Sequence, residues 1–367
     1  MRKERVLVAM SGGVDSSVAA ALLVEQGYDV VGATMKLFCH DDDLPDRPCC
    51  SLDSVNDARR VCDRIGVPHY VLNLEHAFGR DVVGDFVAEY ARGRTPIPCV
   101  RCNTFTKFRD LVTKADGIEA DFVATGHYAR VIDGRLHRGL DPGKDQSYFL
   151  WGLRQVVLDR LLLPVGHLTK AETRRHAAEL GLAHVAAKVE SQDICFVPDG
   201  DHARVIAARL GPDAEALRPG PILMTDGREV GRHEGFARYT IGQRRGLPGG
   251  FAQPMFVVRI DTERRAIVIG PREALAGHGV VASEVNWLGP VPSPGGRVMA
   301  QIRHRSAAAE ATIIETSGER MELAFEAPVF AITPGQSVVV YQGDRVVGGG
   351  IIETDPAGTR RLPVAAA

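Results

Sequence analysis

The chain has 367 residues, of which 45% are hydrophobic and 25% are charged. This length and composition predict a folded protein of two or three domains and exclude a largely disordered chain. The net charge of −2 excludes a uniformly basic nucleic-acid-binding protein, so any contact with RNA must be confined to part of the surface.

The N-terminal sequence and the cysteine count bear on the cellular compartment. Met1–Arg5 runs straight into a short apolar segment, and a run of about 18 apolar residues, enough to start a membrane-spanning helix, occurs nowhere. We therefore expect a cytoplasmic protein with no membrane contact. The seven cysteines are an odd number, so they cannot all form intramolecular disulfides. In a reducing compartment they are expected to be catalytic, metal-binding or buried.

Strand and helix patterns alternate from the N-terminus. Apolar runs and helical periodicity predict strands at 5–10, 28–35, 69–74 and 121–125 and helices at 16–26 and 52–65. This alternation is typical of an α/β protein with a Rossmann-like parallel sheet and helices on both faces. Thr169 and Glu172 have the spacing of a capping box, which predicts a further helix that ends before Gly181.

The segment that joins the first strand to the first helix is the most informative part of the sequence. It reads Ser-Gly-Gly-Val-Asp-Ser at 11–16 and has neither the Gly-Lys-Ser/Thr ending of a Walker loop nor the three-glycine spacing of a dinucleotide-binding turn. Glycines allow close approach of an anion to backbone N–H groups, and a helix N-terminus favours negative charge. The segment therefore predicts a phosphate-binding loop, although glycine and serine are also common in ordinary turns.

Ligands bind at the carboxyl ends of the strands in open parallel sheets. This rule places the loop on one rim with Met35 and with Gly126-His127, which follow two other predicted strands.

A proline-bearing segment contains the pair Cys99 and Cys102 just before an apolar helical stripe. A cysteine near a helix N-terminus has a stabilised thiolate, and Arg101 and Lys107 would stabilise it further. Metal-binding, redox and incidental interpretations of this pair all remain open at this point. A third cysteine, Cys195, lies at another junction between polar and apolar residues.

The second half of the chain predicts a β-rich structure. Its apolar runs are short and are separated by Gly, Pro, Asp and Arg, and they predict strands at 254–260, 266–269, 298–304, 311–314, 337–341 and 346–352. We expect three domains: an ATP-binding catalytic domain at 1–200, a small β-rich central domain at 205–277 and a C-terminal β-barrel at 280–360.

Seven motifs in order resemble the bacterial tRNA-specific 2-thiouridylase family, which belongs to the PP-loop ATP pyrophosphatases. They are the loop at 11–16 and the segments at 98–103, 125–130, 144–150, 191–196, 239–247 and 333–336. The resemblance implies that ATP adenylates O2 of the wobble uridine in tRNAs for Lys, Glu and Gln, and that a persulfide sulfur then replaces this oxygen at C2. It implies that Cys102 is the nucleophile and Cys195 the persulfide carrier.

The resemblance also implies ligands and partners. A cysteine desulfurase or a sulfur-relay protein would donate the sulfur, and Asp15 would help hold Mg²⁺. The positions that match the family's ATP-binding residues are Ala9, Met10, Ser11, Gly12, Gly13, Val14, Asp15, Ser16, Met35 and Gly126. Those that match contacts to tRNA or to its target base are Ile97, Pro98, Cys99, His127, Lys144, Asp145, Gln146, Arg303, His304 and Gln336.

The sequence departs from the family pattern at two of these positions. Cys99 stands where several members have Asp, and His304 replaces the Tyr of an Arg-Tyr-Arg motif. The first change matters for mechanism, because Cys99, Cys102 and Cys195 together also suit a [4Fe–4S] cluster. Of the remaining cysteines, Cys62 lies on an apolar helix face and is expected in the core, and no chemistry is expected of Cys39, Cys49 and Cys50.

Two other functions compete with this interpretation. Another PP-loop ligase would share the loop but would need no cysteine pair. A non-catalytic RNA-binding protein with a structural metal on the three cysteines would leave the loop unexplained. Pyrophosphate release measured with and without tRNA distinguishes all three.

Overall fold

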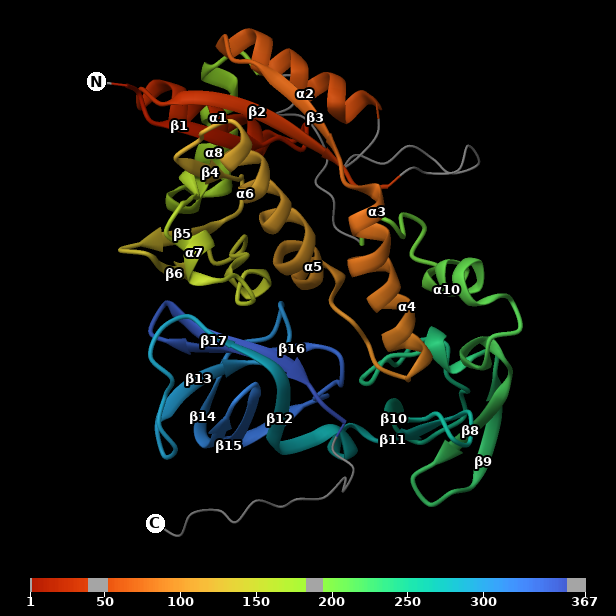
Figure 1. Ribbon diagram of the computed structural model, residues 1–367. Helices are drawn as coiled ribbons and strands as arrows, with labels where there is room; N and C mark the ends of the chain where they lie inside the picture. Colours follow the sequence, from red (N-terminus) through yellow and green to blue (C-terminus); the bar gives the residue numbers. More distant parts are fainter. Residues whose placement is uncertain (1, 39–51, 183–193, 355–367) are drawn as a thin grey trace. The chain divides into compact units, whose positions relative to one another are not determined.

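The computed structural model describes residues 2–38, 52–182 and 194–354 (Figure 1). The chain divides into two compact units. The first unit consists of Met1–Val83, Pro98–Gly200 and Asp344–Val347, and the second consists of Gly84–Ile97, Asp201–Gly343 and Gly348–Ala367. The chain therefore enters the second unit early, at Gly84, and returns to the first at Pro98.

A five-stranded parallel sheet forms the centre of the first unit, in the order β3-β2-β1-β4-β7. Its strands are β1 (Arg5–Ala9), β2 (Asp29–Lys36), β3 (His69–Asn73), β4 (Phe122–Ala124) and β7 (Leu161–Leu162). Four of the five residues of β1 are buried, as are the six inner residues of β2. Consecutive residues of a strand point to opposite faces, so this pattern means that both faces of the sheet are covered.

Helices cover this sheet. They are α1 (Val14–Glu25), α2 (Leu52–Ile65), α6 (Phe108–Gly117) and α8 (Lys170–Glu179). α1 is apolar on nearly all sides because it contacts both α2 and α8, whereas α6 packs against β1 and β4. Cys62 is fully buried in the core between these elements, as predicted, and burial raises the pKa of its thiol to about 11.

Short elements complete the first unit. They are α3 (Glu75–Phe78), α5 (Pro98–Arg101), α7 (Gln155–Leu158), the π-helical turns η1 (Gly79–Val83) and η2 (Cys102–Lys107), the 3₁₀ turns η3 (Ser147–Phe149) and η4 (Pro164–His167), and the hairpin of β5 (Ala129–Ile132) and β6 (Arg135–Arg138). The carboxylate of Asp344 joins the two strands of this hairpin, because it accepts a hydrogen bond from Arg130 at 2.6 Å and lies 3.1 Å from Nδ1 of His137.

Two helices pack together in the second unit beside a small sheet. α4 (Gly84–Ala91) contacts α10 (His202–Leu210), and the ring of Tyr90 stacks on that of His202 with 4.7 Å between centroids. The four-stranded sheet has the order β10-β11-β8-β9. Its strands are β8 (Gly220–Met224), β9 (Glu229–His233), β10 (Phe256–Asp261) and β11 (Ala266–Gly270), and the neighbouring turns are η5 (Glu215–Leu217), η6 (Phe236–Arg238) and η7 (Arg272–Leu275).

A six-stranded β-barrel follows in the order β12-β15-β14-β13-β16-β17, and β12 pairs with β17 to close it. The strands are β12 (Ala276–Trp287), β13 (Arg297–Gln301), β14 (Ala309–Ser317), β15 (Arg320–Phe330), β16 (Ser337–Gln342) and β17 (Arg345–Ile352). β16 is buried along five of its six residues, which form part of the barrel core.

The structure confirms the predicted fold class, with a helix-covered parallel sheet, a small β-rich region and a C-terminal barrel. The helix predicted to open at the capping box and to end before Gly181 is also confirmed, since α8 spans Lys170–Glu179 and Thr169 and Glu172 form both hydrogen bonds of a capping box. The first helix begins at Val14 rather than at 16, because Gly13 takes the extended conformation of an N-cap. The division at 1–200, 205–277 and 280–360 stays a prediction.

Candidate active site and nucleic-acid contacts

The loop between β1 and α1 has the features of an anion-binding site. No side chain caps the N-terminus of α1, so the N–H groups of its first turn are available to a ligand. The side chains of Ser16 and Ser17 instead donate to the carbonyl of Gly13 at 3.2 and 2.8 Å and hold the turn in shape. Gly12 has a φ of +71°, and a Cβ there would lie 2.2 Å from the carbonyl oxygen of Ser54. Only glycine fits this position.

The structure brings the other predicted ATP-binding residues to the same edge of the sheet. Ala9 ends β1 and pairs with Ala33 in β2, two residues before the buried Met35. Gly126 follows β4, and a Cβ on it would lie 2.5 Å from the backbone nitrogen of Ser16. Gly126 is therefore packed directly against the first turn of α1. That these residues bind ATP stays a prediction.

Two side chains that contact Asp15 were not predicted from the sequence. The ammonium of Lys170 lies 2.8 and 3.0 Å from the two carboxylate oxygens of Asp15, and the hydroxyl of Tyr128 lies 2.8 Å from Oδ1. Lys170 is the first residue of α8, and its side chain is only 10% exposed. No local pattern links positions 15 and 170, so only the fold could reveal this pair.

Asp15 could bind Mg²⁺ only together with the phosphates of a bound substrate. Its side chain keeps 30% of its surface exposed, so a lone pair can reach a cation beside the loop. In the described part of the chain, no group of three or more His, Cys, Asp or Glu side chains is arranged to hold a metal ion. Magnesium sites of this kind use one or two carboxylates together with substrate phosphates.

The three candidate cysteines differ in exposure. Cys102 is buried at the start of η2, Cys99 is exposed in α5, and Cys195 is partly buried. Phe196 contacts Phe78 of α3 with ring centroids 5.6 Å apart, and η2 packs against α3, so Cys102 and Cys195 lie on segments that share α3 as a neighbour. The three thiols do not form a recognisable metal site among the described residues. Cys39, Cys49 and Cys50 lie outside the described residues.

Several predicted tRNA contacts of the first unit support the structure around Tyr128. The backbone N–H of Tyr128 donates to the side-chain carbonyl of Gln146 at 2.9 Å. The nearly buried carboxylate of Asp145 accepts from Arg138 at 2.8 Å and from the backbone of Ser147 at 3.0 Å. Lys144 lies just before them in the same turn. These residues are brought together, but Asp145 is committed to internal hydrogen bonds.

His127 is an uncharged histidine at neutral pH. Its Nδ1 lies 2.7 Å from the hydroxyl of Thr125. Burial of the ring, with a smaller contribution from the Lys107 ammonium, lowers the pKa of His127 to about 3. At neutral pH this side chain can form hydrogen bonds but carries no positive charge.

This pKa predicts an acid-dependent loss of stability. The unfolded chain takes up a proton at His127 near pH 6.5, whereas the folded chain does so only near pH 3, so the contribution to folding is present above pH 6.5 and is lost as the pH falls below it. The loss is at most about 1.4 kcal/mol per pH unit for one group. Denaturant unfolding at pH 7.0 and 5.5 should show a smaller pH dependence for His127→Gln than for the wild type; equal dependence would contradict the assignment.

In the second unit, four separate segments converge around Thr95. Its carbonyl accepts from the side chain of Gln336 at 2.8 Å, and its hydroxyl lies 3.4 Å from that of Thr240. The guanidinium of Arg303 donates to the carbonyl of Ile241 at 2.7 Å and to the hydroxyl of Thr333. Arg303 and Gln336 thus belong to one connected group of loops with the segment at 239–247. Ile97 and His304 lie close to this group in sequence, two residues after Thr95 and next to Arg303.

This group carries exposed arginines. Arg244, Arg245 and Arg305 are all exposed on the loops that Arg303 joins. We predict that Arg244→Ala with Arg305→Ala weakens tRNA binding and lowers the slope of log affinity against log salt by about 0.7 to 0.9 for each phosphate that is no longer neutralised. Arg320→Ala, which removes an exposed arginine from the start of β15 in the barrel, is the matched control. Unchanged affinity and slope in the double variant would remove these loops from the tRNA interface.

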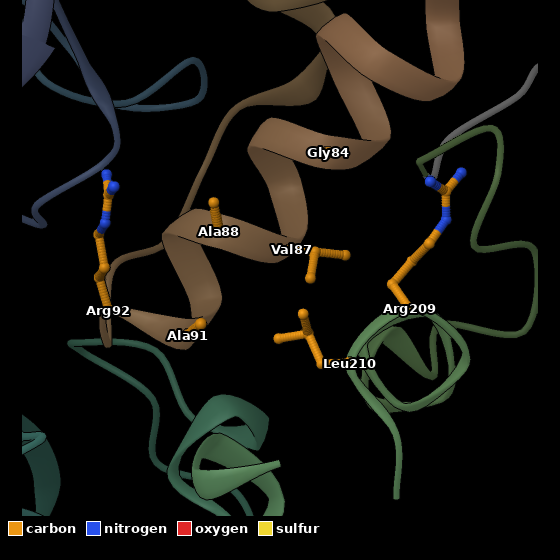
Figure 2. Close-up of a pocket in the computed structure, with 7 residues that line it drawn as sticks. All are labelled: Gly84, Val87, Ala88, Ala91, Arg92, Arg209 and Leu210. Atoms are coloured by element: carbon orange, nitrogen blue, oxygen red, sulfur yellow. The ribbon is translucent and has the colours of Figure 1, made fainter. Parts of the chain in front are cut away.

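A separate hollow of about 450 Å³ lies between α4 and α10 of the second unit (Figure 2). Val87, Ala88 and Ala91 of α4 line it with Leu210 of α10, and Arg92 and Arg209 lie at its sides. It contains none of the residues predicted from the sequence to bind ATP or tRNA.

Comparison of the chain with models of known protein families shows which class of protein it belongs to. Residues 4–199 match the tRNA methyl transferase HUP domain, residues 213–271 the tRNA methyl transferase PRC-barrel domain, and residues 277–352 the aminomethyltransferase beta-barrel domain. The chain is thus built as a nucleotide-binding α/β domain followed by the β-domains of a tRNA-modifying family.

Individual relatives narrow this class. The chain is 50% identical to the tRNA-specific 2-thiouridylase MnmA of Rhodospirillum centenum, over 96% of this chain and 93% of that one. It is 47% identical to that of Geobacter metallireducens, over 96% and 97% of the two chains. The chain belongs to the tRNA-specific 2-thiouridylase family, which confirms the resemblance seen in the sequence.

Likeness to solved structures is weaker. An NMN synthetase from Francisella tularensis matches 57% of this chain and 77% of that one, at 18% identity and a TM-score of 0.34. The assignment to the family therefore depends on the family models and the curated relatives.

Proposed function

We propose that the chain is an ATP-dependent tRNA-uridine 2-sulfurtransferase that forms 2-thiouridine at the wobble position of tRNAs for Lys, Glu and Gln. The observation that carries this proposal is that one compact unit holds both an uncapped phosphate-binding loop and the cysteines Cys102 and Cys195. A ligase of the same superfamily needs the loop but not the thiols, and a non-catalytic RNA-binding protein needs no loop. The family of the chain supports the same conclusion.

The first chemical step is adenylation of the uridine. The uridine loses its N3 proton as O2 attacks the α-phosphorus of ATP, and diphosphate leaves as the bond between the α-phosphorus and the bridging oxygen breaks. Backbone N–H groups of Gly12, Gly13 and the first turn of α1 would hold the phosphates, with the hydroxyls of Ser11 and Ser16 beside them. Met35 and Gly126 would lie against the nucleoside. Mg²⁺, when bound by Asp15 and the phosphates, supplies charge neutralisation.

The second step transfers sulfur. The terminal sulfur of a persulfide on Cys195 attacks C2, AMP leaves with the former O2, and the tRNA is joined to Cys195 through a disulfide. The Cys102 thiolate then attacks the Sγ of Cys195, which releases 2-thiouridine and leaves a Cys102–Cys195 disulfide. A dithiol reductant restores both thiols, and a cysteine desulfurase or a sulfur-relay protein reloads Cys195. We place this reaction in the cytoplasm, where tRNA is found; none of the described helices is long and apolar enough to cross a membrane.

The tRNA would be held by both units. Ile97, Pro98 and Cys99 would contact the target base, and His127, Lys144, Gln146, Arg303, His304 and Gln336 would contact backbone and ribose groups. Asp145, whose carboxylate is held by Arg138, is proposed to shape this turn and to contact tRNA only through its backbone or a remaining lone pair.

Pyrophosphate release tests the proposed function directly. We expect release from ATP to require an unmodified tRNA substrate and to be followed by 2-thiouridine in nuclease digests when a persulfide donor is present. Pyrophosphate release by a ligase would depend on that enzyme's own substrate and not on tRNA, and an RNA-binding protein would release none. Either result would overturn the proposal.

The role of Cys99 separates the persulfide route from an iron–sulfur route. In the persulfide route only Cys102 and Cys195 exchange sulfur, so Cys99→Asp should retain activity within about threefold, because the family tolerates Asp at this position. In the cluster route Cys99, Cys102 and Cys195 each bind iron, and the same change should remove iron and activity together. The measurements are 2-thiouridine formation and the iron content of protein purified without oxygen. We expect the first result, because the sulfur-transfer steps proposed above require only Cys102 and Cys195.

A further inference from the structure

The phosphate-binding loop contains an acidic residue at the point where a polyanion is expected to bind. Asp15 is the second residue of α1, and no side chain caps the N-terminus of this helix. A carboxylate at this point would repel the phosphate chain of ATP unless another charge offset it. The structure provides that charge in Lys170.

Lys170 is held against the loop by burial and by charge. Its side chain is 10% exposed, and its ammonium lies 2.8 and 3.0 Å from the two oxygens of Asp15. Burial of a lysine ammonium is unfavourable without a close anionic partner. The Asp15–Lys170 pair has no net charge. The partial positive charge at the N-terminus of α1 therefore remains the main electrostatic attraction for an approaching phosphate.

Further contacts fix the positions of Asp15 and of the backbone of Lys170. The hydroxyl of Tyr128 lies 2.8 Å from Asp15 and 2.9 Å from the hydroxyl of Thr173, and the ammonium of Lys170 lies 5.6 Å from the centre of the Tyr128 ring. The capping box of Thr169 fixes the first turn of α8, and the backbone N–H of Lys170 donates to Asp141 at 3.0 Å. The capping box and Asp141 therefore hold the backbone of Lys170 at the start of α8.

We propose that Lys170 is a phosphate-contacting cation of this site, and that Asp15 and Tyr128 are positioning residues that hold its ammonium beside the N-terminus of α1. The inference depends on the proposed use of ATP. As the bond between the α-phosphorus and the bridging oxygen breaks, negative charge grows on the leaving diphosphate, and the ammonium offsets it without any proton transfer. Asp15 thus acts through Lys170 as well as through any bound metal.

Binding in the absence of metal isolates this effect. ATP and inorganic diphosphate are titrated calorimetrically into the full chain, without tRNA and with EDTA present. Lys170→Met leaves the Asp15 carboxylate without its cationic partner and should weaken the binding of both ligands at least tenfold. Asp15→Asn removes the repelling charge and should tighten both at least threefold. The double variant should bind with an affinity between those of the two single variants.

Arg5→Met is the matched control. Arg5 forms an ion pair of 2.7 Å with Asp29 in the same unit, but it lies at the amino end of β1, away from the loop at the carboxyl end. Its loss should lower stability and leave both affinities within twofold of the wild type.

The signs of the changes decide between the interpretations. If the ion pair serves only to hold the fold, Lys170→Met and Asp15→Asn should both lower the unfolding free energy, and their affinities should change in the same direction or not at all; that result overturns the inference alone. A wild-type chain that binds neither ATP nor diphosphate, with or without Mg²⁺, would overturn the proposed use of ATP as well. Because Asp15→Asn is expected to tighten binding, its result remains informative if Lys170→Met does not fold.

Discussion

Replacement of Cys195 by serine should abolish 2-thiouridine formation and leave tRNA-dependent pyrophosphate release within about threefold of the wild type. Serine preserves the size of the side chain but cannot carry a persulfide, and adenylation of the uridine precedes sulfur transfer. Cys195 is partly exposed, so a protein donor can reach it for reloading. Mass analysis of tRNA digests and a pyrophosphate assay on the same sample measure the two steps separately.

Cys62→Ala is the control for this experiment. The Cys62 thiol is fully buried and its pKa is raised to about 11, so it has neither the access nor the ionisation that sulfur transfer needs. Its removal should cost stability but not thiolation per folded molecule. Normal 2-thiouridine levels in Cys195→Ser would exclude Cys195 as the carrier, whatever the control shows.

The second large effect is expected at Asp15. Asp15→Ala should lower pyrophosphate release at least a hundredfold while leaving tRNA affinity unchanged, because Asp15 would hold Lys170 and a bound Mg²⁺ beside the reacting phosphates, and the loss of such electrostatic support typically costs this much. Lys170 and Tyr128 would both lose their common partner. In Asp15→Ala, the affinity for ATP measured without metal should therefore rise, whereas the rate of pyrophosphate release measured with Mg²⁺ should fall.

Asp116→Ala is a suitable comparison, since it removes another acidic residue of the first unit from an ion pair, that with Arg160 at 2.7 Å. It should leave turnover within about twofold of the wild type. Turnover of Asp15→Ala within tenfold of the wild type would contradict its proposed role in the reaction.

Local sequence was enough to predict the parts of the fold that depend on local patterns. The strands β1 to β4 and the helices α2 and α8 follow from apolar runs, helical periodicity and the Thr169–Glu172 capping box. The hairpin of β5 and β6 and the long strands β12 and β15 were not predicted. The second half of β15, Glu326–Phe330, is mostly exposed. The alternation of apolar and polar residues that predicts a strand is therefore missing there.

The candidate site shows the same limit. Ser11–Ser16 could be predicted as a phosphate-binding loop because strand, glycines and helix are contiguous. Lys170 could not, because it reaches Asp15 only when α8 packs against α1. The three cysteines are a different case: a [4Fe–4S] cluster on them stays a prediction, and among the described residues no group of three or more His, Cys, Asp or Glu side chains is arranged to hold a metal ion.

The segment Gly84–Ile97 belongs to the second unit but is synthesised before most of that unit, and this order affects folding on the ribosome. α4 is made in the first quarter of the chain, but its stacking partner His202 follows about 110 residues later, a delay on the order of ten seconds at ordinary translation rates. During this interval α10 is not yet available to cover the apolar side of α4. A fragment that ends at residue 199 would keep the parallel sheet and this unmatched helix together, and we expect it to aggregate unless residues 202–210 are supplied.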